Sequence, residues 1–242
     1  MVNKNPYAGN FHQTRHQETN YAAKKILTIL LDVFEIHSAI DIGCGVGTFL
    51  WFLEQRGVSD ILGLDGDWVN HELLVITPDK FLPVDLKTLP KFERAYDLLI
   101  CLEVAEHLPP EYAADFIGKL CKLSNLVLFS AAVPGQKGRA HLNEAWQSYW
   151  AKLFAEHNYH PLDLIRPKIW HDSAIPFWYR QNTLVYVKAG EQLAPQNFEA
   201  CPLDIIHPEL FQLRTNKPAP TPLFKRLLKK LKISKLYEKF GR

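Results

Sequence analysis

The residues that most clearly suggest chemistry stand in the stretch 39–50, which reads AIDIGCGVGTFL. Three glycines alternate there, at Gly43, Gly45 and Gly47. Glycine is needed where the backbone takes a positive φ or where a Cβ would collide with a ligand. The dinucleotide fingerprint is G-x-G-x-x-G, whereas here Thr48 stands in the place of its third glycine. The spacing therefore does not favour a dinucleotide.

Asp41 precedes the first of these glycines by two residues. A carboxylate at this place would repel a pyrophosphate, which binds to the bare N–H groups of a helix N-terminus. It would favour a cationic ligand, and S-adenosylmethionine carries both an ammonium and a sulfonium group. The alternative is that Asp41 only orders the turn.

Further acidic residues stand where the next predicted strands end. Asp65 ends the second strand, where a carboxylate can accept both hydroxyl groups of a ribose. Asp85 closes the third strand, where an adenine edge would lie, and its alternative is a solvated loop aspartate. Leu102 and Glu103 end the fourth strand, at the other side of the expected crevice. The pattern predicts a nucleoside site.

Two histidines are candidate catalytic residues. His141 lies in the polar stretch GRAHLNEAW after the fifth predicted strand, at the mouth of the expected crevice. It is a base or a hydrogen-bond partner of the substrate, or else it only orders the loop. Glu106 and His107 follow the fourth strand, and we favour a part in the site's architecture over catalysis for them. No spacing typical of metal ligands is found, so no metal site is predicted.

Aromatic residues gather between 146 and 179. Trp150 is one helical turn from Trp146, a spacing typical of core packing. The stretch PFWYRQN stands at a predicted strand entrance, where aromatic rings with polar neighbours could bind a sugar or an aromatic acid. The predicted substrate contacts are Glu106, Tyr149, Trp178, Tyr179 and Arg180. Arg180 could instead pair with a structural carboxylate.

The order of the predicted elements indicates the fold class. Strands are predicted at 38–43, 60–65, 80–86, 96–103, 125–131, 159–167 and 182–189. Helices are predicted at 19–35, capped by Thr19 or Asn20, and at 47–57, 109–123 and 143–158, the last capped by Asn143 or Glu144. Strands that alternate with helices predict an α/β fold with a mostly parallel sheet and helices on both faces.

Four segments are predicted from changes in composition and hydrophobic periodicity along the chain. They are an N-terminal arm (1–18), the α/β domain (19–189), a proline-containing arm or linker (190–222) and a basic amphipathic helix (223–242). The last segment carries eight Lys or Arg residues against one Glu. It could dock on the domain, lie on an anionic membrane surface, or bind a nucleic acid or protein.

Composition excludes several classes of protein. The 242 residues are 47% hydrophobic and 22% charged with a net charge of +2, an ordinary globular balance. Without residues 223–242 the net charge is about −5, so no nucleic-acid partner is expected. The four cysteines form no CxxC pair, and neither a signal peptide nor a membrane span is evident. A cytoplasmic protein is expected, and the basic segment is a candidate for contact with the inner face of a membrane.

Four motifs together resemble the class I S-adenosylmethionine-dependent methyltransferases. They are AIDIGCGVGTF, GLDGD, PVDL and YDLLICLEVAEHLPPE, and the resemblance covers roughly residues 20–190. The stretch LEVAEHLP is similar to the ubiquinone-type subgroup, which acts on small molecules. The stretch after residue 134 is similar to a bacterial branch tied to surface glycans and secondary metabolites.

This resemblance implies a Rossmann-like sheet of seven strands in the order 3-2-1-4-5-7-6, with the seventh antiparallel. It implies that Asp41, Gly43, Gly45 and Gly47 hold the methionine end, Asp65 the ribose and Asp85 the adenine. Further cofactor contacts are expected at Cys44, Gly66, Leu86, Leu102 and Glu103.

The expected function is methyl transfer from S-adenosylmethionine to a small-molecule acceptor, with an oxygen of a sugar, glycolipid or secondary metabolite as the first candidate. One alternative is an inactive cofactor-binding partner subunit. Another is an RNA or protein methyltransferase, which the negative charge of the body disfavours. The stretch CLEV after the fourth strand replaces the Asn-Pro-Pro-aromatic motif, which disfavours adenine-N6 or glutamine acceptors.

Overall fold

The computed structural model describes residues 11–190 and 202–215. The basic helix predicted over 223–242 lies outside these residues. Among the described helices, none has the length and apolar character that crossing a bilayer requires.

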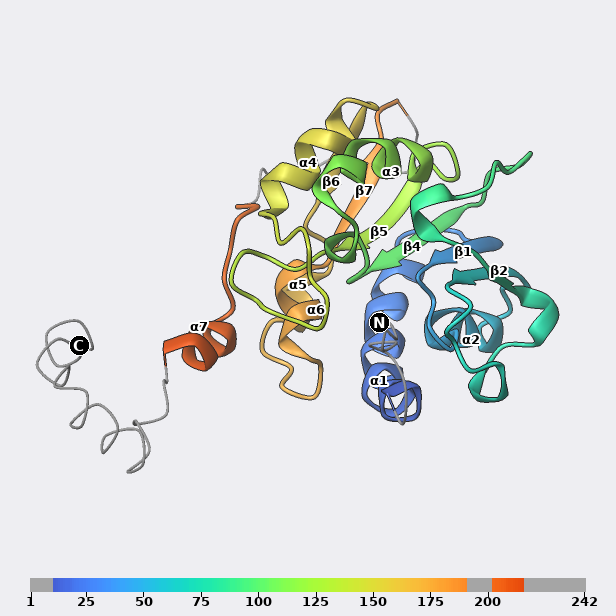
Figure 1. The fold of residues 1–242 in the computed structure, drawn as a ribbon, viewed down its shortest axis with the longest axis horizontal. Coiled ribbons are helices and arrows are strands. Elements are labelled where there is room, and N and C mark those ends of the chain that lie inside the picture. The colour runs from blue at the N-terminus through green and yellow to red at the C-terminus, as the bar shows by residue number, and fades with distance from the viewer. Residues whose placement is uncertain (1–10, 191–201, 216–242) are drawn as a thin grey trace, which may run out of the picture. The chain divides into compact units, whose positions relative to one another are not determined.

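A seven-stranded sheet forms the centre of the fold (Figure 1). Its strands are β1 (Ser38–Ile42), β2 (Asp60–Asp65), β3 (Phe81–Pro83), β4 (Leu98–Leu102), β5 (Leu126–Ser130), β6 (Tyr159–Leu162) and β7 (Leu184–Lys188). Their order is β3-β2-β1-β4-β5-β7-β6. Strand β7 runs antiparallel to both β5 and β6, and the other pairings are parallel. The predicted order and the predicted direction of the seventh strand are confirmed.

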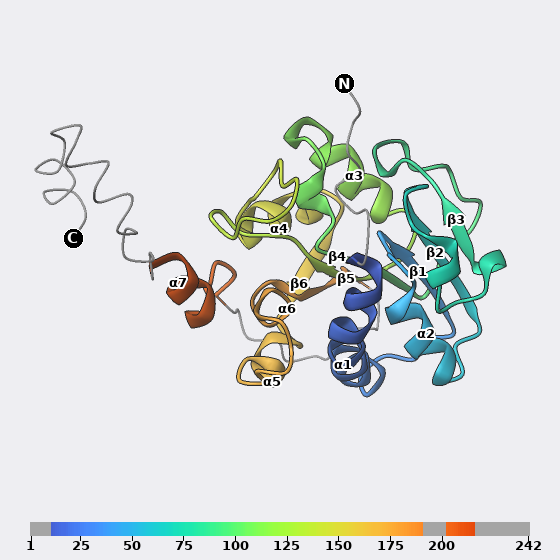
Figure 2. The ribbon, with the colours of Figure 1, turned by 60° about the horizontal axis from the view of Figure 1, so that its bottom comes forward.

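The sheet separates two apolar cores, and side chains alternate between them along each central strand. In β4, Leu98 and Ile100 belong to one core, whereas Leu99 and Cys101 belong to the other. The first core is covered by α1 (Phe11–Leu31), α2 (Thr48–Gln55), α5 (Arg166–Ile169) and α6 (Phe177–Asn182), and the second by α3 (Ala113–Leu120) and α4 (Gln147–Ala155) (Figures 1 and 2). Burial on both faces explains why these strands are almost continuously apolar.

The first helix begins earlier than predicted. Helix α1 starts at Phe11, so Thr19 and Asn20 lie inside it and do not cap it. Because residues 12–18 are polar and show no apolar period, their sequence carries no helix signal. His16 nevertheless lies 3.0 Å from the hydroxyl of Thr48, and its ring meets Trp51 edge-on. The part of the predicted N-terminal arm that the structure describes is therefore helix.

Two other local features differ from the prediction. The stretch 177–182 stands at the entrance of β7, as predicted, but it forms helix α6, so Asn182 is not part of the strand, and the polar side chains of the helix are buried. Helix α4 begins at Gln147, and neither Asn143 nor Glu144 caps it. The backbone N–H of Asn143 donates to the carbonyl of Glu106, and the Glu144 carboxylate accepts from the N–H of Gly135. Asn143 and Glu144, which the sequence pattern predicted as helix caps, therefore make tertiary contacts instead.

The described part of the predicted proline arm begins as a strap over 202–207 that lies on the α/β unit. Buried Arg166 pairs with Asp163 and donates to the carbonyls of Pro202 and Leu203. The Asp204 carboxylate accepts the backbone N–H and the hydroxyl of Ser148. The first structural unit therefore extends to His207, and α7 (Pro208–Thr215) belongs to the second.

Candidate active site

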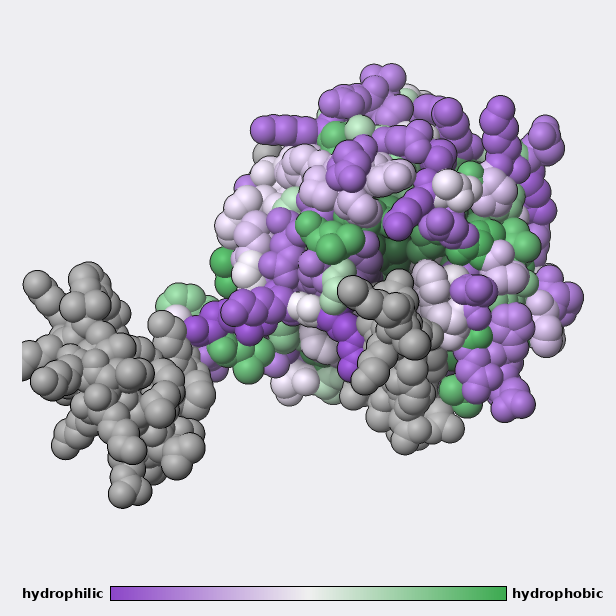
Figure 3. All heavy atoms as spheres, viewed as in Figure 1, coloured by the Kyte–Doolittle hydropathy of each residue, from purple (hydrophilic) through white to green (hydrophobic). Residues whose placement is uncertain are grey.

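A cavity of about 360 Å³ opens at the carboxyl ends of β1, β2 and β4. Figure 3 shows a hollow beside hydrophobic side chains on this face of the molecule. All of the predicted cofactor contacts line the cavity except Gly47 and Gly66. Parallel strands that end side by side bring residues 41, 65 and 103 together, as the ends of such strands do at binding sites of α/β proteins.

The glycine loop is shaped by its packing as well as by its backbone angles. Gly43 has a φ of 84°, and a Cβ there would lie 2.3 Å from Cγ2 of Val104. Gly47 has a φ of 86°, and a Cβ there would lie 2.8 Å from Ile76. Gly47 is therefore needed to pack on the apolar core, and the structure does not place it at the cavity wall.

Asp65 braces the loop. Its carboxylate accepts the backbone N–H of Gly45 at 2.8 Å and that of Gly66 at 2.6 Å. The side chain of Trp68 also hydrogen-bonds to it. Trp68 lies over Gly66, where a Cβ would come within 2.3 Å of the indole. Gly66 therefore allows the indole to reach Asp65 and acts from behind the cavity wall.

Burial disfavours the ionised forms of the aspartates that line the cavity. Asp41 is 3% exposed, and burial, then the nearby charge of Asp65, raise its pKa well above the usual value. Burial also raises the pKa of Asp65, against the opposing effect of its hydrogen bonds. Among the described lining residues, Lys87 is the only lysine or arginine. A bound cation would stabilise the ionised form of both aspartates.

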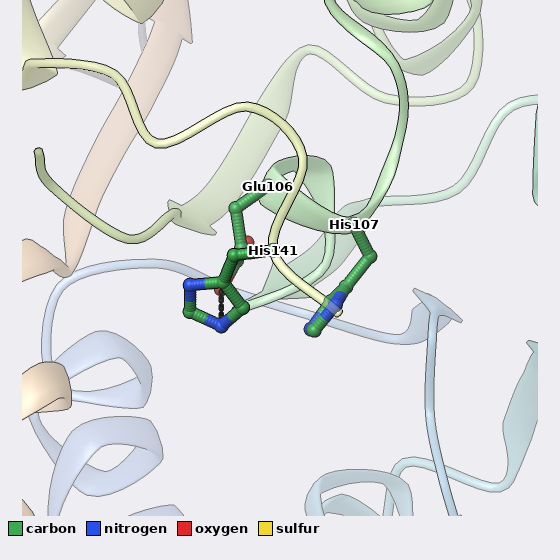
Figure 4. Close-up of side chains that lie close together, drawn as sticks. All are labelled: Glu106, His107 and His141. Atoms are coloured by element: carbon green, nitrogen blue, oxygen red, sulfur yellow. Dashed lines mark ion pairs between the residues drawn. The ribbon is translucent and has the colours of Figure 1, made fainter. Parts of the chain in front are cut away.

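Three side chains that could take part in proton transfer lie close together at one side of the cavity: Glu106, His107 and His141 (Figure 4). Glu106 and His107 lie in a short 3-10 turn after β4, and His141 lies in the loop between β5 and α4. The two histidine rings meet edge-on at 4.9 Å between centroids. Nε2 of His141 lies 4.0 Å from Oε1 of Glu106. His107 lines the cavity, whereas Glu106 and His141 do not.

Hydrogen bonds assign the tautomers of both histidines. Nδ1 of His141 lies 2.9 Å from a carboxylate oxygen of Glu144, which can only accept. Nδ1 of His107 lies 3.3 Å from the carbonyl oxygen of Ala140, which also can only accept. In both neutral rings the proton is therefore on Nδ1, and Nε2 carries the lone pair. His107 therefore offers a basic nitrogen in the cavity wall, whereas Nε2 of His141 faces the buried Glu106.

Glu106 is fully buried, and no described side chain donates a hydrogen bond to its carboxylate, although the backbone N–H groups of Glu106 and Ala132 lie close enough to lower its pKa. Burial, followed by the charge of Glu103, raises the pKa of Glu106 well above the usual value. Burial with few donors favours the neutral form of a carboxyl group. Glu106 is therefore suited to hold a proton beside His141.

The predicted acceptor contacts separate into two groups. Tyr179 lines the cavity, next to Phe49. Tyr149 packs on Trp150, and Trp178 packs on the first core, both away from the cavity wall. Arg180 is 4% exposed and donates to the carbonyl of Trp170. Helix α6 turns the Arg180 side chain inward, which explains why it does not reach the wall.

Several lining residues have no clear signal in the sequence. They include Thr19, Phe49, Trp68, Val104, Leu108 and Leu142. Leu142 is 57% exposed beside His141, so apolar surface stands at the edge of the cavity. In the sequence, the only indication of this apolar edge is that Leu142 is an apolar residue within a polar loop.

The family model described as "Methyltransferase domain" matches residues 14–165. The chain belongs to the class I S-adenosylmethionine-dependent methyltransferases. The matched residues run from α1 through the cavity residues and the His141 loop to just beyond the end of β6. The family predicted from the four motifs is confirmed.

Two curated relatives match part of the chain. The ubiquinone biosynthesis O-methyltransferase of Rickettsia prowazekii is 30% identical over 112 residues, which are 44% of this chain and 43% of that protein. The tRNA U34 carboxymethyltransferase of Ectopseudomonas mendocina is 27% identical over 40% of this chain and 33% of that protein. The matches therefore span less than half the length of these relatives.

Solved structures share the fold. The magnesium protoporphyrin IX methyltransferase from Synechocystis PCC 6803 with bound SAH is 20% identical, with a TM-score of 0.50 over 76% of this chain and 91% of that one. An O-methyltransferase family protein from Burkholderia thailandensis is 15% identical, with a TM-score of 0.55 over 75% of this chain and 59% of that one.

The packing of Gly43 predicts a large loss of stability for Gly43→Ala. The alanine would bear the backbone strain of a positive φ, about 1–2 kcal/mol, and would also overlap Val104. Gly57→Ala is the matched control, since Gly57 has a φ of 92° but open space around it. Urea unfolding should show a larger loss for Gly43→Ala, and Val104→Ala should restore part of it. Equal losses in the two glycine variants would contradict the overlap.

The raised pKa of Glu106 predicts that Glu106→Gln stabilises the protein at pH 8 but not at pH 4. A carboxyl group whose pKa is raised on folding favours the folded state below its unfolded pKa, about 4.3. That contribution is lost as the pH rises through the folded-state pKa, and neutral glutamine does not lose it. Thermal unfolding at several pH values measures the difference. Glu111→Gln, at an exposed glutamate, should show no such dependence, and a parallel pH profile for both variants would rule out the effect.

Proposed function

We propose that this chain transfers the methyl group of S-adenosylmethionine to an oxygen of a small-molecule acceptor. The observation that carries the proposal is the pairing of an acidic cavity, lined by Asp41, Asp65 and Glu103, with the basic nitrogen of His107 in its wall. The carboxylates suit a ligand with an ammonium and a sulfonium group. The histidine suits an acceptor that must lose a proton.

Each predicted cofactor residue has a part in this proposal. Asp41 and the glycine loop hold the methionine end, and Asp65 accepts the ribose hydroxyls with the lone pairs that its loop bonds leave. Asp85, whose carboxylate accepts the N–H of Lys87, stands at the adenine edge. The fit rests on charge, because the buried aspartates gain most from a cationic ligand.

The cofactor supplies an activated methyl group, so the protein mainly has to align an acceptor and remove its proton. The wall beside His107 contains Leu108 and Leu142, and Phe49 and Tyr179 also line the cavity. These apolar groups exclude water from the acceptor. The Nε2 atom of His107 then takes the hydroxyl proton, while Ala140 holds its ring in place.

His141 has a supporting part in this mechanism. It was the first candidate for the base from the sequence, but it lies behind the wall and packs edge-on against His107. Glu144 orients its ring, and Glu106 lies near its other nitrogen. His141, Glu144 and Glu106 can stabilise the positive charge that develops on the His107 ring. They can also accept the proton that His107 takes from the acceptor.

Sugars, glycolipids and secondary metabolites remain the candidate acceptors. The relation to a tRNA-modifying enzyme makes RNA a second acceptor to test. RNA binding would need basic surface near the cavity, and the negative charge of residues 1–222 does not supply it. An inactive partner subunit would bind the cofactor without turnover. Membrane contact through 223–242 would suit a lipid-linked acceptor and stays a prediction.

Calorimetric titration tests the cofactor site. We expect S-adenosylmethionine to bind and NADH not to bind, because the lining carboxylates repel a pyrophosphate. Asp65→Asn should weaken binding of S-adenosylmethionine by about 10-fold or more, as expected for loss of a charge-assisted hydrogen bond. Asp67→Asn, at an exposed aspartate two residues along, should leave it unchanged. Preferential binding of NADH would overturn the methyltransferase proposal.

Formation of S-adenosylhomocysteine tests the chemistry. Wild-type protein is supplied with pools of sugars, lipid-linked sugars, phenolic acids or RNA, and the pool that gives turnover identifies the acceptor class. His107→Gln should then lower turnover by about 10²- to 10⁴-fold while cofactor affinity is retained. His160→Gln, at an exposed histidine, is the control. Full turnover by His107→Gln would remove His107 as the base.

A further inference from the structure

A chain of buried side-chain amides runs from the cavity wall into the domain. Gln136 lies in the loop after β5, and Gln181 and Asn182 lie at the end of α6. Their exposures are 4%, 0% and 2%. Side-chain amides are mostly exposed in proteins, and burying one is costly unless its donors and acceptors are satisfied. The burial of three side-chain amides in one cluster therefore calls for a structural or functional explanation.

The amides converge on Glu103. The Asn182 amide donates to Oε1 of Glu103 at 3.0 Å, and the Gln136 amide donates to Oε2 at 2.9 Å. The backbone at Glu103 has a φ of 56°, a left-handed conformation that costs energy for a residue with a Cβ. Both carboxylate oxygens and the backbone of Glu103 are thus held in one arrangement at the cavity wall.

The direction of this hydrogen-bond chain is set at its far end. The backbone N–H of His207 donates to Oε1 of Gln181 at 2.7 Å, and a backbone N–H can only donate. The Gln181 amide must therefore point its NH₂ group away from His207, where it donates to Oδ1 of Asn182 at 2.8 Å. Asn182 in turn points its NH₂ group at Glu103. Every donor in the chain is thus aimed toward the carboxylate.

His207 is held in place by the strap over 202–207. Arg166 binds the carbonyls of Pro202 and Leu203, and the ring of His207 lies 4.6 Å from that of Trp170. The strap is distant from Glu103 in the sequence. The hydrogen-bond chain nevertheless links it to the cavity through buried groups only.

The amide donors act on the charge of Glu103. Burial raises the pKa of this carboxyl group above its usual value, and the bonds from Asn182, Ser130 and Gln136 offset part of that rise. Glu106, a few residues away, has no such donors, and its pKa is raised well above the usual value. The contrast between the two buried glutamates indicates that the amide chain favours the ionised form of Glu103.

We propose that Gln136, Gln181 and Asn182 are positioning residues that present Glu103 as an anion to the ammonium group of the cofactor's amino-acid end. The inference rests on the proposed function, because it takes the ligand to be S-adenosylmethionine or its product. It extends the site to residues that touch no ligand and to the strap, whose His207 N–H orients the chain.

Two cofactor fragments separate positioning from simple support of the fold. S-adenosylhomocysteine carries the amino-acid end, whereas methylthioadenosine has the same adenosine end and no ammonium group. Gln181→Met should weaken S-adenosylhomocysteine by about 10- to 100-fold, the range for a bond to a charged group, and should leave methylthioadenosine unchanged. Glu103→Gln, a neutral change of the same size, should show the same selective loss. Calorimetry measures both ligands, and urea unfolding confirms that each variant is folded.

Gln147→Met is the matched control. Gln147 is a third buried glutamine, 3% exposed, whose amide donates to the backbone carbonyl of Gln181 and not to Glu103. Gln147→Met should leave the affinity for S-adenosylhomocysteine and for methylthioadenosine unchanged. Equal weakening of both ligands in Gln181→Met, or no weakening of either, would overturn the inference and leave the cofactor site intact. If the wild-type protein binds neither ligand, the proposed function fails first.

Discussion

The arrangement of this protein depends on burying several carboxylates at one end of a parallel sheet. Asp41, Asp65 and Glu103 line one cavity, and Glu106 lies directly behind it. Removing a carboxylate from water is unfavourable unless hydrogen bonds or an opposite charge compensate. The fold supplies backbone N–H groups for Asp65 and amides for Glu103. For Asp41, the cationic ligand that we propose would complete the compensation.

The buried carboxylates differ in what surrounds them, and this difference divides the work of the site. Glu103 receives two amide donors and is suited to remain an anion that binds a cation. Glu106 receives no side-chain donor and is suited to carry a proton beside His141. His107 connects the two regions, since it lines the cavity and packs against His141. Acid–base chemistry and cation binding can therefore proceed a few residues apart without interfering.

Much of the fold follows from periodicity. Apolar runs such as residues 98–102 and 126–130 can only be central strands, because both of their faces are buried. The early start of α1 and the helical form of residues 177–182 could not be predicted from these patterns. Both depend on contacts with distant segments: His16 meets Thr48, and Gln181 meets the His207 backbone. Local pattern carries no information about such partners.

The sequence alone determined the family and most of the cavity wall, because a glycine loop and the residues that end parallel strands are close in sequence to the strands that position them. Only the tertiary structure decided which histidine reaches the cavity, and that Arg180 turns inward. It also joined His207 to Glu103 through buried amides. The physical reason is that the direction of a side chain on a loop or a short helix is set by packing and by hydrogen-bond partners far away in the chain.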